Sequence, residues 1–193
     1  MKKIITALTL ICLCVALLAS CGAAHPIDKL EKSIMDEKNV QVDITMSDIP
    51  FFGTVQVTMK IDGNKTYTSG LFGESATYTE TDGDTVYTYT QNDDEKWTKT
   101  SSTVTPSESD NIISDNDMSI IFDSENYTQS KDNEKKYIMN DDVTFEGFSE
   151  ITLTIIEDGC IVEGKLNSDG MVCGIKMTFH KIGETSITLP EVK

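Results

Sequence analysis

The sequence predicts a mainly β (α+β) protein built around one strongly curved antiparallel sheet. Asp-Gly pairs recur at 62–63, 82–83, 158–159 and 169–170, and Asp-Gly between alternating segments is a strong signal for a hairpin with a type I′ turn. The flanking segments alternate apolar and polar residues, as half-buried strands do. In the N-terminal part both faces carry apolar residues, as expected of a curved sheet with something packed inside it.

The chain opens with the features of a secretory signal. Lys2 and Lys3 precede an uncharged run over 4–19, which is shorter than the roughly 20 apolar residues of a membrane span. The sequence Leu18-Ala19-Ser20-Cys21 then resembles the bacterial lipobox. This resemblance implies cleavage just before Cys21 and attachment of a lipid to its thiol. An ordinary signal peptide and an uncleaved anchor are the alternatives.

We therefore expect a lipoprotein signal peptide over 1–20, a tether over 21–26 and a single domain over 27–193. A diacylglycerol on Cys21 would hold the protein at the extracytoplasmic face of the cell membrane, because stable anchoring takes at least two acyl chains. The sequence does not distinguish an inner from an outer membrane, and it leaves the oligomeric state open.

The mature chain would be strongly acidic. Without the first two lysines it has 14 lysines, no arginine and 32 acidic residues, a net charge of about −18. Such a surface repels phosphate backbones, so no nucleic acid partner is expected. Solubility at a cell surface is the simplest interpretation of this charge.

A short amphipathic helix is predicted directly after the tether. Ile27, Leu30 and Ile34 lie at helical spacing within 27–38, and Pro26 suits the first turn of a helix.

Strands follow the helix. Alternation begins at Val40, and hairpins are predicted over 54–70 and 75–91. A turn centred on 82–83 would place Tyr78 opposite Tyr87.

If 71–74 is a four-residue loop, Tyr67 lies beside Tyr78, which gives a tyrosine ladder across neighbouring strands. Residues 101–117 break the pattern and are expected to form a long loop. A helical turn within 118–127 and a hairpin around 131–134 should follow.

The C-terminal part predicts a three-stranded meander with one face in the core. The apolar positions of that face are Ile151, Leu153, Ile155, Cys160, Val162, Leu166, Met171, Cys173, Ile175, Met177 and Phe179. A turn at 169–170 would place Cys173 opposite Leu166 and leave Cys160 roughly 20 Å away. That separation exceeds disulfide reach, so we expect free thiols.

Catalytic chemistry finds little support, and we expect neither an enzyme nor a cofactor. The segment 159–165, GCIVEGK, resembles a phosphate-binding loop, but Leu166 replaces the required Ser or Thr and the segment is a predicted strand. His180 falls opposite the apolar face and is interpreted as a polar surface residue. The acidic segments 92–95, 115–118 and 140–142 lack a calcium-loop pattern and are interpreted as solvated turns, so no metal is expected.

The remaining candidate site is a binding surface. Tyr67, Tyr78, Tyr87 and Tyr89 share one side of the curved sheet, and the nearby loops contain Phe51, Phe52, Leu71 and Phe72. Exposed aromatic and aliphatic loop residues often mark a binding edge. The alternative is that these tyrosines pack beneath the N-terminal helix as core.

The layout is similar to small bacterial lipoproteins of the LolA/LppX-like group, especially uncharacterised Gram-positive members. The likeness comprises the lipobox, one helix, the segments VTMKIDGNKTYT (57–68) and DTVYTYTQNDDEKWTK (84–99), and a final hairpin ending in Ile187-Thr188-Leu189-Pro190. It implies an unclosed antiparallel half-barrel, with the N-terminal helix and a short helical or loop insertion on the concave side. It also implies a lipid or acyl-chain ligand in the hydrophobic hollow.

We therefore expect a membrane-anchored extracytoplasmic lipoprotein that binds a hydrophobic ligand in its concave sheet, with the four tyrosines as candidate contacts. The alternative is a surface interaction or sensory module with a filled core and no ligand. An extracellular hydrolase is a distant third reading.

Overall fold

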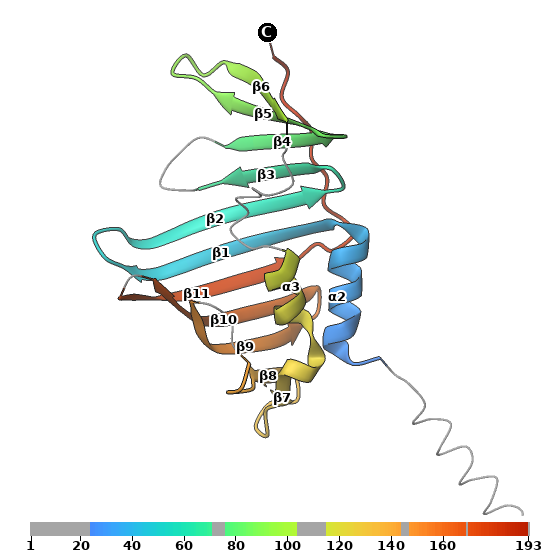
Figure 1. The fold of residues 1–193 in the computed structure, drawn as a ribbon, viewed down its shortest axis with the longest axis vertical. Helices are drawn as coiled ribbons and strands as arrows, with labels where there is room; N and C mark the ends of the chain where they lie inside the picture. Colours follow the sequence, from blue (N-terminus) through green and yellow to red (C-terminus); the bar gives the residue numbers. More distant parts are fainter. Residues whose placement is uncertain (1–23, 71–75, 104–114, 144–146, 169, 193) are drawn as a thin grey trace, which may run out of the picture.

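The computed structural model describes residues 24–70, 76–103, 115–143, 147–168 and 170–192. The predicted signal peptide and lipobox, with Cys21, lie outside these residues, as does the predicted loop at 71–74. The elements are α2 (Pro26–Glu37), β1 (Asn39–Ile49), β2 (Gly53–Asp62), β3 (Lys65–Ser69), β4 (Thr77–Asp82), β5 (Thr85–Gln91), β6 (Trp97–Thr103), α3 (Asp115–Phe122), the 3-10 helix η2 (Ser124–Asn126), β7 (Tyr127–Gln129), β8 (Lys136–Met139), β9 (Phe148–Ile156), β10 (Gly159–Ser168) and β11 (Met171–His180) (Figure 1).

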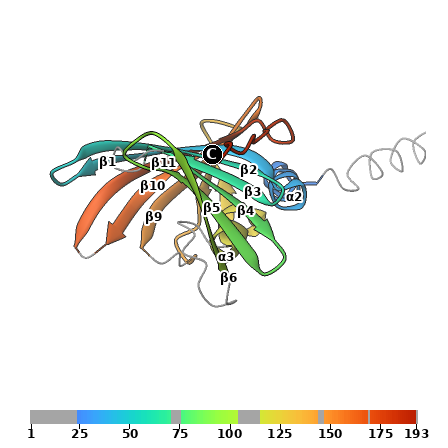
Figure 2. The same cartoon turned by 90° about the horizontal axis from the view of Figure 1, so that it is seen from above.

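All eleven strands belong to one antiparallel sheet in the order β6-β5-β4-β3-β2-β1-β11-β10-β9-β8-β7. Two meanders, β1–β6 and β7–β11, are joined because β1 pairs with β11, with Ile44 opposite Met177. The sheet is unclosed, since β6 and β7 lie at its two edges. Figure 2 shows its curvature, with α2 and α3 on the concave side. The predicted half-barrel, with its N-terminal helix and short helical insertion, is confirmed.

We call the face that α2 and α3 cover the inner face, and the opposite one the outer face. Helix α2 begins where predicted, with Pro26 in its first turn and His25 Nδ1 accepting a hydrogen bond from the Ile27 amide at 3.3 Å. It ends at Lys38, which adopts a left-handed conformation with φ of 45°. Ile27 and Ile34 are buried in the main core.

The C-terminal meander has the predicted apolar face. Leu166 lies opposite Cys173, and Cys160 lies opposite Ile155. Cys160 is buried, Cys173 is half-buried, and both are free thiols. This confirms the exclusion of a disulfide between them.

The type I′ turns predicted at 62–63 and 82–83 are wrong. In the first hairpin Asp62 pairs with Lys65, and of the two central residues only Gly63 has a positive φ. In the hairpin at 82–85 the closing pair is Asp82 with Thr85, so the central residues are Gly83 and Asp84. Of these only Gly83 has a positive φ, 58°, which fits a type II′ turn, where glycine takes the first central position. A type I′ turn would need positive φ at both positions.

The turn shifts the strand pairing by two residues. Tyr78 faces Tyr89, and Tyr87 faces Glu80, so the predicted pairing of Tyr78 with Tyr87 is wrong. Because side chains alternate with a period of two, this shift leaves every residue on its predicted face. The predicted neighbours Tyr67 and Tyr78 do lie opposite each other.

The predicted loop at 101–117 is wrong at both ends. Residues 101–103 belong to β6, which pairs with β5, and α3 begins at Asp115. The predicted hairpin around 131–134 is confirmed by the pairing of β7 with β8.

The buried face of the sheet changes side along its length. In β1, β2 and β9–β11 the apolar residues face inward and contact the helices. In β3–β6 the inner face instead carries threonines, and the aromatic side chains point outward. The inward threonines are Thr66, Thr68, Thr77, Thr79, Thr81, Thr88, Thr90, Thr98 and Thr100.

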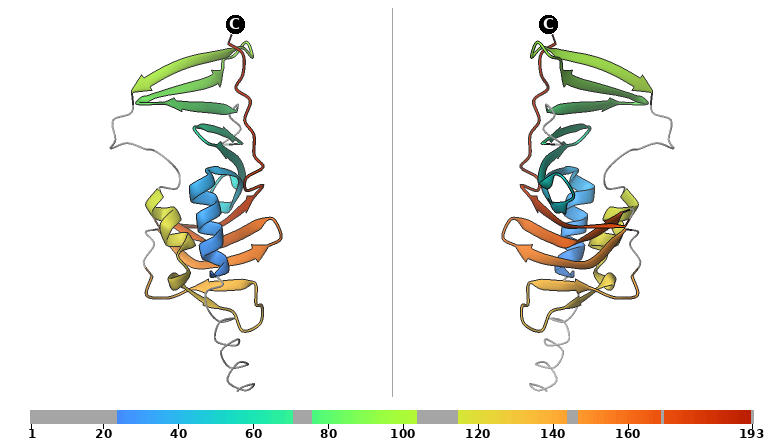
Figure 3. Two further views of the ribbon diagram at one scale, coloured as in Figure 1. Left: turned by 90° about the vertical axis from the view of Figure 1, so that its right-hand side faces the viewer. Right: turned by 90° about the vertical axis from the view of Figure 1, so that its left-hand side faces the viewer.

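The C-terminal tail, residues 181–192, lies along the outer face and continues towards β5 and β6 (Figures 1 and 3). The Asn39 side chain pairs with the Thr185 backbone, accepting from its amide at 2.7 Å and donating to its carbonyl at 2.8 Å. The Ile187 amide donates to Asp62 Oδ2 at 3.0 Å, and the Ile187 side chain is buried. The tail therefore covers part of the outer face.

Candidate functional site

An apolar pocket of about 360 Å³ lies between α2, α3 and the inner face of β1–β3. We call it the inner pocket. Its lining residues are Ile34, Met35, Lys38, Val40, Val42, Ile44, Met59, Ile61, Gly63, Asn64, Lys65, Thr66, Thr81, Met118 and Phe179. This volume is at the lower end of the range for ligand pockets, roughly 300–1,000 Å³.

Strand alternation and helix spacing explain the apolar lining. Successive inward positions of β1 supply three aliphatic side chains, and β2 adds Met59 and Ile61 opposite them. Helix α2 contributes Ile34 and Met35 from its last turns, and α3 contributes Met118. The sheet and both helices therefore all border the same space.

The polar rim of the pocket is held by backbone hydrogen bonds. The Gly63 amide donates to the Lys38 carbonyl at 2.8 Å, which ties the end of α2 to the β2–β3 turn. The Thr81 amide donates to the Asn64 carbonyl at 2.9 Å, and Asn64 Nδ2 donates to the Thr81 carbonyl at 2.7 Å. These contacts fix the turn against β4.

Among the side chains that the structure describes, no carboxylate lines the inner pocket, although the chain contains 32 acidic residues. Two other depressions, of about 470 and 610 Å³, do carry carboxylates: Glu157, Asp158 and Glu184 in the first, Asp141 and Glu150 in the second. The inner pocket combines an apolar floor with a rim whose described residues carry no negative charge. It therefore suits a neutral or anionic amphiphile better than a cation.

The four predicted tyrosines lie on the outer face, away from the inner pocket. They form, with Trp97, a group that we call the outer aromatic ladder: Tyr67, Tyr78, Tyr87, Tyr89 and Trp97. The alternative, that the tyrosines pack beneath the N-terminal helix as core, is wrong, because α2 covers the other face.

Edge-on contacts connect the ladder. The ring centroids of Tyr67 and Tyr78 lie 4.9 Å apart, and those of Tyr78 and Trp97 lie 5.3 Å apart. Lys99 Nζ lies 3.8 Å from the ring centroid of Tyr87, a favourable cation–π distance. Burial raises the pKa of Tyr78, and the neighbouring Tyr67 hydroxyl adds to this effect. Sequence reasoning missed Trp97 because the turn before it carries no apolar pattern.

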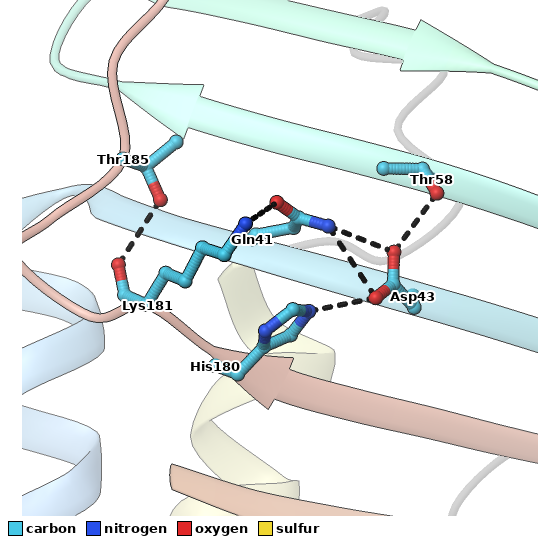
Figure 4. Close-up of polar contacts among 6 residues, drawn as sticks. All are labelled: Gln41, Asp43, Thr58, His180, Lys181 and Thr185. Carbon is cyan, nitrogen blue, oxygen red and sulfur yellow. Dashed lines mark hydrogen bonds and ion pairs between the residues drawn. The ribbon is translucent and has the colours of Figure 1, made fainter. Parts of the chain in front are cut away.

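A polar cluster on the outer face gives His180 a partner (Figure 4). His180 Nε2 lies 2.7 Å from Asp43 Oδ2, and Thr58 Oγ1 donates to Asp43 Oδ1 at 2.8 Å. Partial burial alone would raise the pKa of Asp43, but hydrogen bonds from Gln41, Thr58 and His180 outweigh burial and lower the pKa. The sequence placed His180 on the correct face but could not supply its partner, which is 137 positions away.

Two buried groups of the core are chemically inert. Burial raises the pKa of the Cys160 thiol to about 12, so it stays protonated and is a poor nucleophile near neutral pH. The Tyr127 hydroxyl is buried without a hydrogen-bond partner among the described residues, and burial also raises its pKa.

Within the part of the chain that the structure describes, His, Cys, Asp and Glu side chains form no group of three that could hold a metal ion. Over the same residues, every helix is too short or too polar to cross a bilayer. Neither a protein-family model nor a curated protein matches this chain.

Proposed function

We propose that this protein is a membrane-anchored extracytoplasmic lipoprotein that binds a hydrophobic ligand, a lipid or an acyl chain, in the inner pocket. The pocket itself is the observation that supports the proposal. It lies on the concave side, its floor is aliphatic, and its described rim residues offer hydrogen-bond donors and no carboxylate. In such a ligand, the acyl chain would contact the aliphatic floor and a neutral or anionic head group would face the polar rim.

Burial of hydrocarbon would drive the binding. Each methylene group transferred from water contributes roughly 0.8 kcal/mol, and association costs subtract several kcal/mol from the sum. A pocket of about 360 Å³ therefore favours a single chain or another small apolar ligand over a complete two-chain lipid.

Membership of the LolA/LppX-like group and lipid attachment at Cys21 belong to the same proposal. An unclosed antiparallel sheet with helices on its concave side is the fold that this resemblance implies, but many functions share one fold. The ligand must therefore be tested directly.

The first test is extraction of protein purified without detergent, followed by mass spectrometry, with a co-purified lipid as the expected result. Lipid-depleted protein should also bind a fluorescent fatty acid. Ile61→Phe should reduce this binding at least tenfold, because Ile61 lines the pocket. Ile155→Phe is the matched control, since Ile155 is a half-buried inward residue outside the pocket lining. A clean extract, or equal losses in both variants, would refute the pocket as the site.

The anchor has its own test. Cys21→Ala should release the protein from the membrane or block its processing. Normal processing and unchanged membrane retention of this variant would remove the lipoprotein proposal.

The outer aromatic ladder favours the alternative, a surface interaction module. Its aromatic rings resemble the composition of interface cores, which are enriched in Tyr and Trp. For this alternative, Tyr67→Ala should weaken capture of a partner protein while fatty-acid binding stays unchanged.

A further inference from the structure

Two exposed apolar segments lie at one end of the sheet: the turn that follows β1, and the first two residues of β11. The side chains of Phe51 and Phe52 are 105% and 61% exposed, and those of Met171 and Val172 are 49% and 54% exposed. We call these four residues the apolar tip. They account for most of the large exposed hydrophobic residues in the described chain.

Strand pairing places the two segments at the same end of the sheet. Ser47 of β1 lies opposite Gly174 of β11, and this is the last pair between the two strands. Both segments therefore project from the same end of the sheet (Figure 1). β1 has 11 residues, or roughly 35 Å, so the tip lies about this far from the junction of β1 with α2.

Phe51 is held in an unfavourable backbone conformation. Its φ is 71°, in the left-handed region that bulky residues rarely adopt. The turn is closed by the Phe52 amide, which donates to the Ile49 carbonyl at 3.2 Å. Glycine would fit this φ without strain. A fully exposed phenylalanine at such a position contributes little to folding, which points to a contact outside the molecule.

The tip lacks positive charge. Asp48 and Asp169 are the only charged residues of 48–53 and 169–173. Binding through these segments would therefore depend on apolar burial rather than on attraction to anionic groups. Cys173 and Ile175, the next inward residues of β11 after Met171, continue the apolar inner face towards the core.

We propose that the apolar tip inserts into the interface of a phospholipid bilayer, and this holds whatever the inner pocket binds. A stable protein interface needs about 800 Å² from each partner, more than four side chains on two narrow segments provide. Protruding apolar segments suit insertion between lipid head groups. The contact is separate from the predicted anchor, because the tip is at the far end of β1 from α2.

The test measures sedimentation of the protein with phosphatidylcholine vesicles. A chain starting at Gly22 removes the anchor and keeps the whole core, whose residues run from Ile27 to Ile187. We expect this chain to bind, and Phe51→Ser with Phe52→Ser to weaken binding at least tenfold. Ile138→Ser is the matched control, because Ile138 is 48% exposed on β8 away from the tip. Adding anionic lipid at low salt should weaken binding, because the chain from Gly22 carries a net charge of about −18.

Phe51→Gly separates a binding role from a structural one. It should weaken vesicle binding without lowering the urea midpoint of unfolding, because glycine accepts the left-handed conformation. Failure of the parent chain to bind vesicles, equal losses in the Ile138 control, or a lower midpoint with unchanged binding would each overturn the proposal. So would a purified protein partner that binds the tip when vesicles do not.

Discussion

The helix-covered half of the sheet and its threonine-bearing half place their apolar side chains on opposite faces. In β1, β2 and β9–β11 the apolar residues point inward, and α2 and α3 cover them. In β3–β6 the inner face carries threonines, and the aromatic ladder lies outside, where the C-terminal tail passes. Both halves alternate regularly along each strand. Alternation along a strand therefore divides its residues between two faces. The segment that covers a face determines whether that face is buried.

The two halves also differ in what a ligand would meet. The inner pocket lies at their boundary, with Val42 and Ile44 on one side and Thr66 and Thr81 on the other. An amphiphile placed there would have apolar and hydroxyl-bearing walls. Such a boundary is a physical reason for the pocket to have one apolar and one polar side.

The largest expected difference between the halves is in the cost of removing an aromatic ring. Phe179 is buried and lies edge-on to Phe122 with 5.2 Å between ring centroids. Phe179→Ala should lower the free energy of unfolding by about 3–5 kcal/mol. Tyr78→Ala should cost about 1–2 kcal/mol, because Tyr78 is only half-buried. Urea denaturation measures both, and equal losses would contradict the proposed difference in cover.

The tail can be tested as the cover of the outer face. Ile187→Ala should lower the free energy of unfolding by about 2 kcal/mol, because this side chain is buried. Val192→Ala should change it by less than about 0.5 kcal/mol, because Val192 is exposed. If both variants unfold alike, the tail does not contribute a packed layer.

Removing one hydroxyl should stabilise the helix-covered half. Tyr127→Phe deletes the buried hydroxyl that has no hydrogen-bond partner among the described residues. An unsatisfied buried polar group costs about 1–3 kcal/mol, so a gain of about 1 kcal/mol is expected in urea denaturation. A loss of stability would show that the hydroxyl has a partner, such as a buried water.

The smallest expected effect is on the free energy of unfolding at acid pH, and it involves Asp43 on the outer face. The pKa of Asp43 is lowered in the folded protein, so its stabilising contribution is present above its unfolded value of about 3.9. That contribution is lost as the pH falls through the folded pKa. Asp43→Asn should therefore flatten the fall of stability below about pH 4, by less than about 1 kcal/mol, because the side chain is partly exposed. Parallel curves of stability against pH for both proteins would contradict this.

The sequence predicts the face of the sheet on which a side chain lies better than it predicts the residue that lies opposite it. Alternation assigned Leu153, Val162 and Met177 to one buried face, and the structure agrees. The pairing of Tyr78 was predicted two residues off, because Asp-Gly can occupy two positions in a hairpin. Both positions preserve the alternation, so the pattern could not distinguish them.

Other features depend on contacts that no local pattern encodes. β6 has almost no apolar alternation and forms because its backbone pairs with β5. The hydrogen bond between Asp43 and His180 depends on the pairing of β1 with β11. The inner pocket arises where Ile34 of α2 and Met118 of α3 approach the sheet without filling the space. Its existence is a property of that spacing and could not be derived from residue types.

The junction of β1 with β11 has a consequence for how the chain is made. Synthesis proceeds from the N-terminus, so the strand that will lie at the centre emerges long before its second partner, Met171–His180. Until then one edge of β1 stays unpaired, and the core cannot close. Contacts this remote in sequence also slow folding. For the export that we propose, such a delay is favourable, because a chain that folds late can pass through a translocation channel before its core closes.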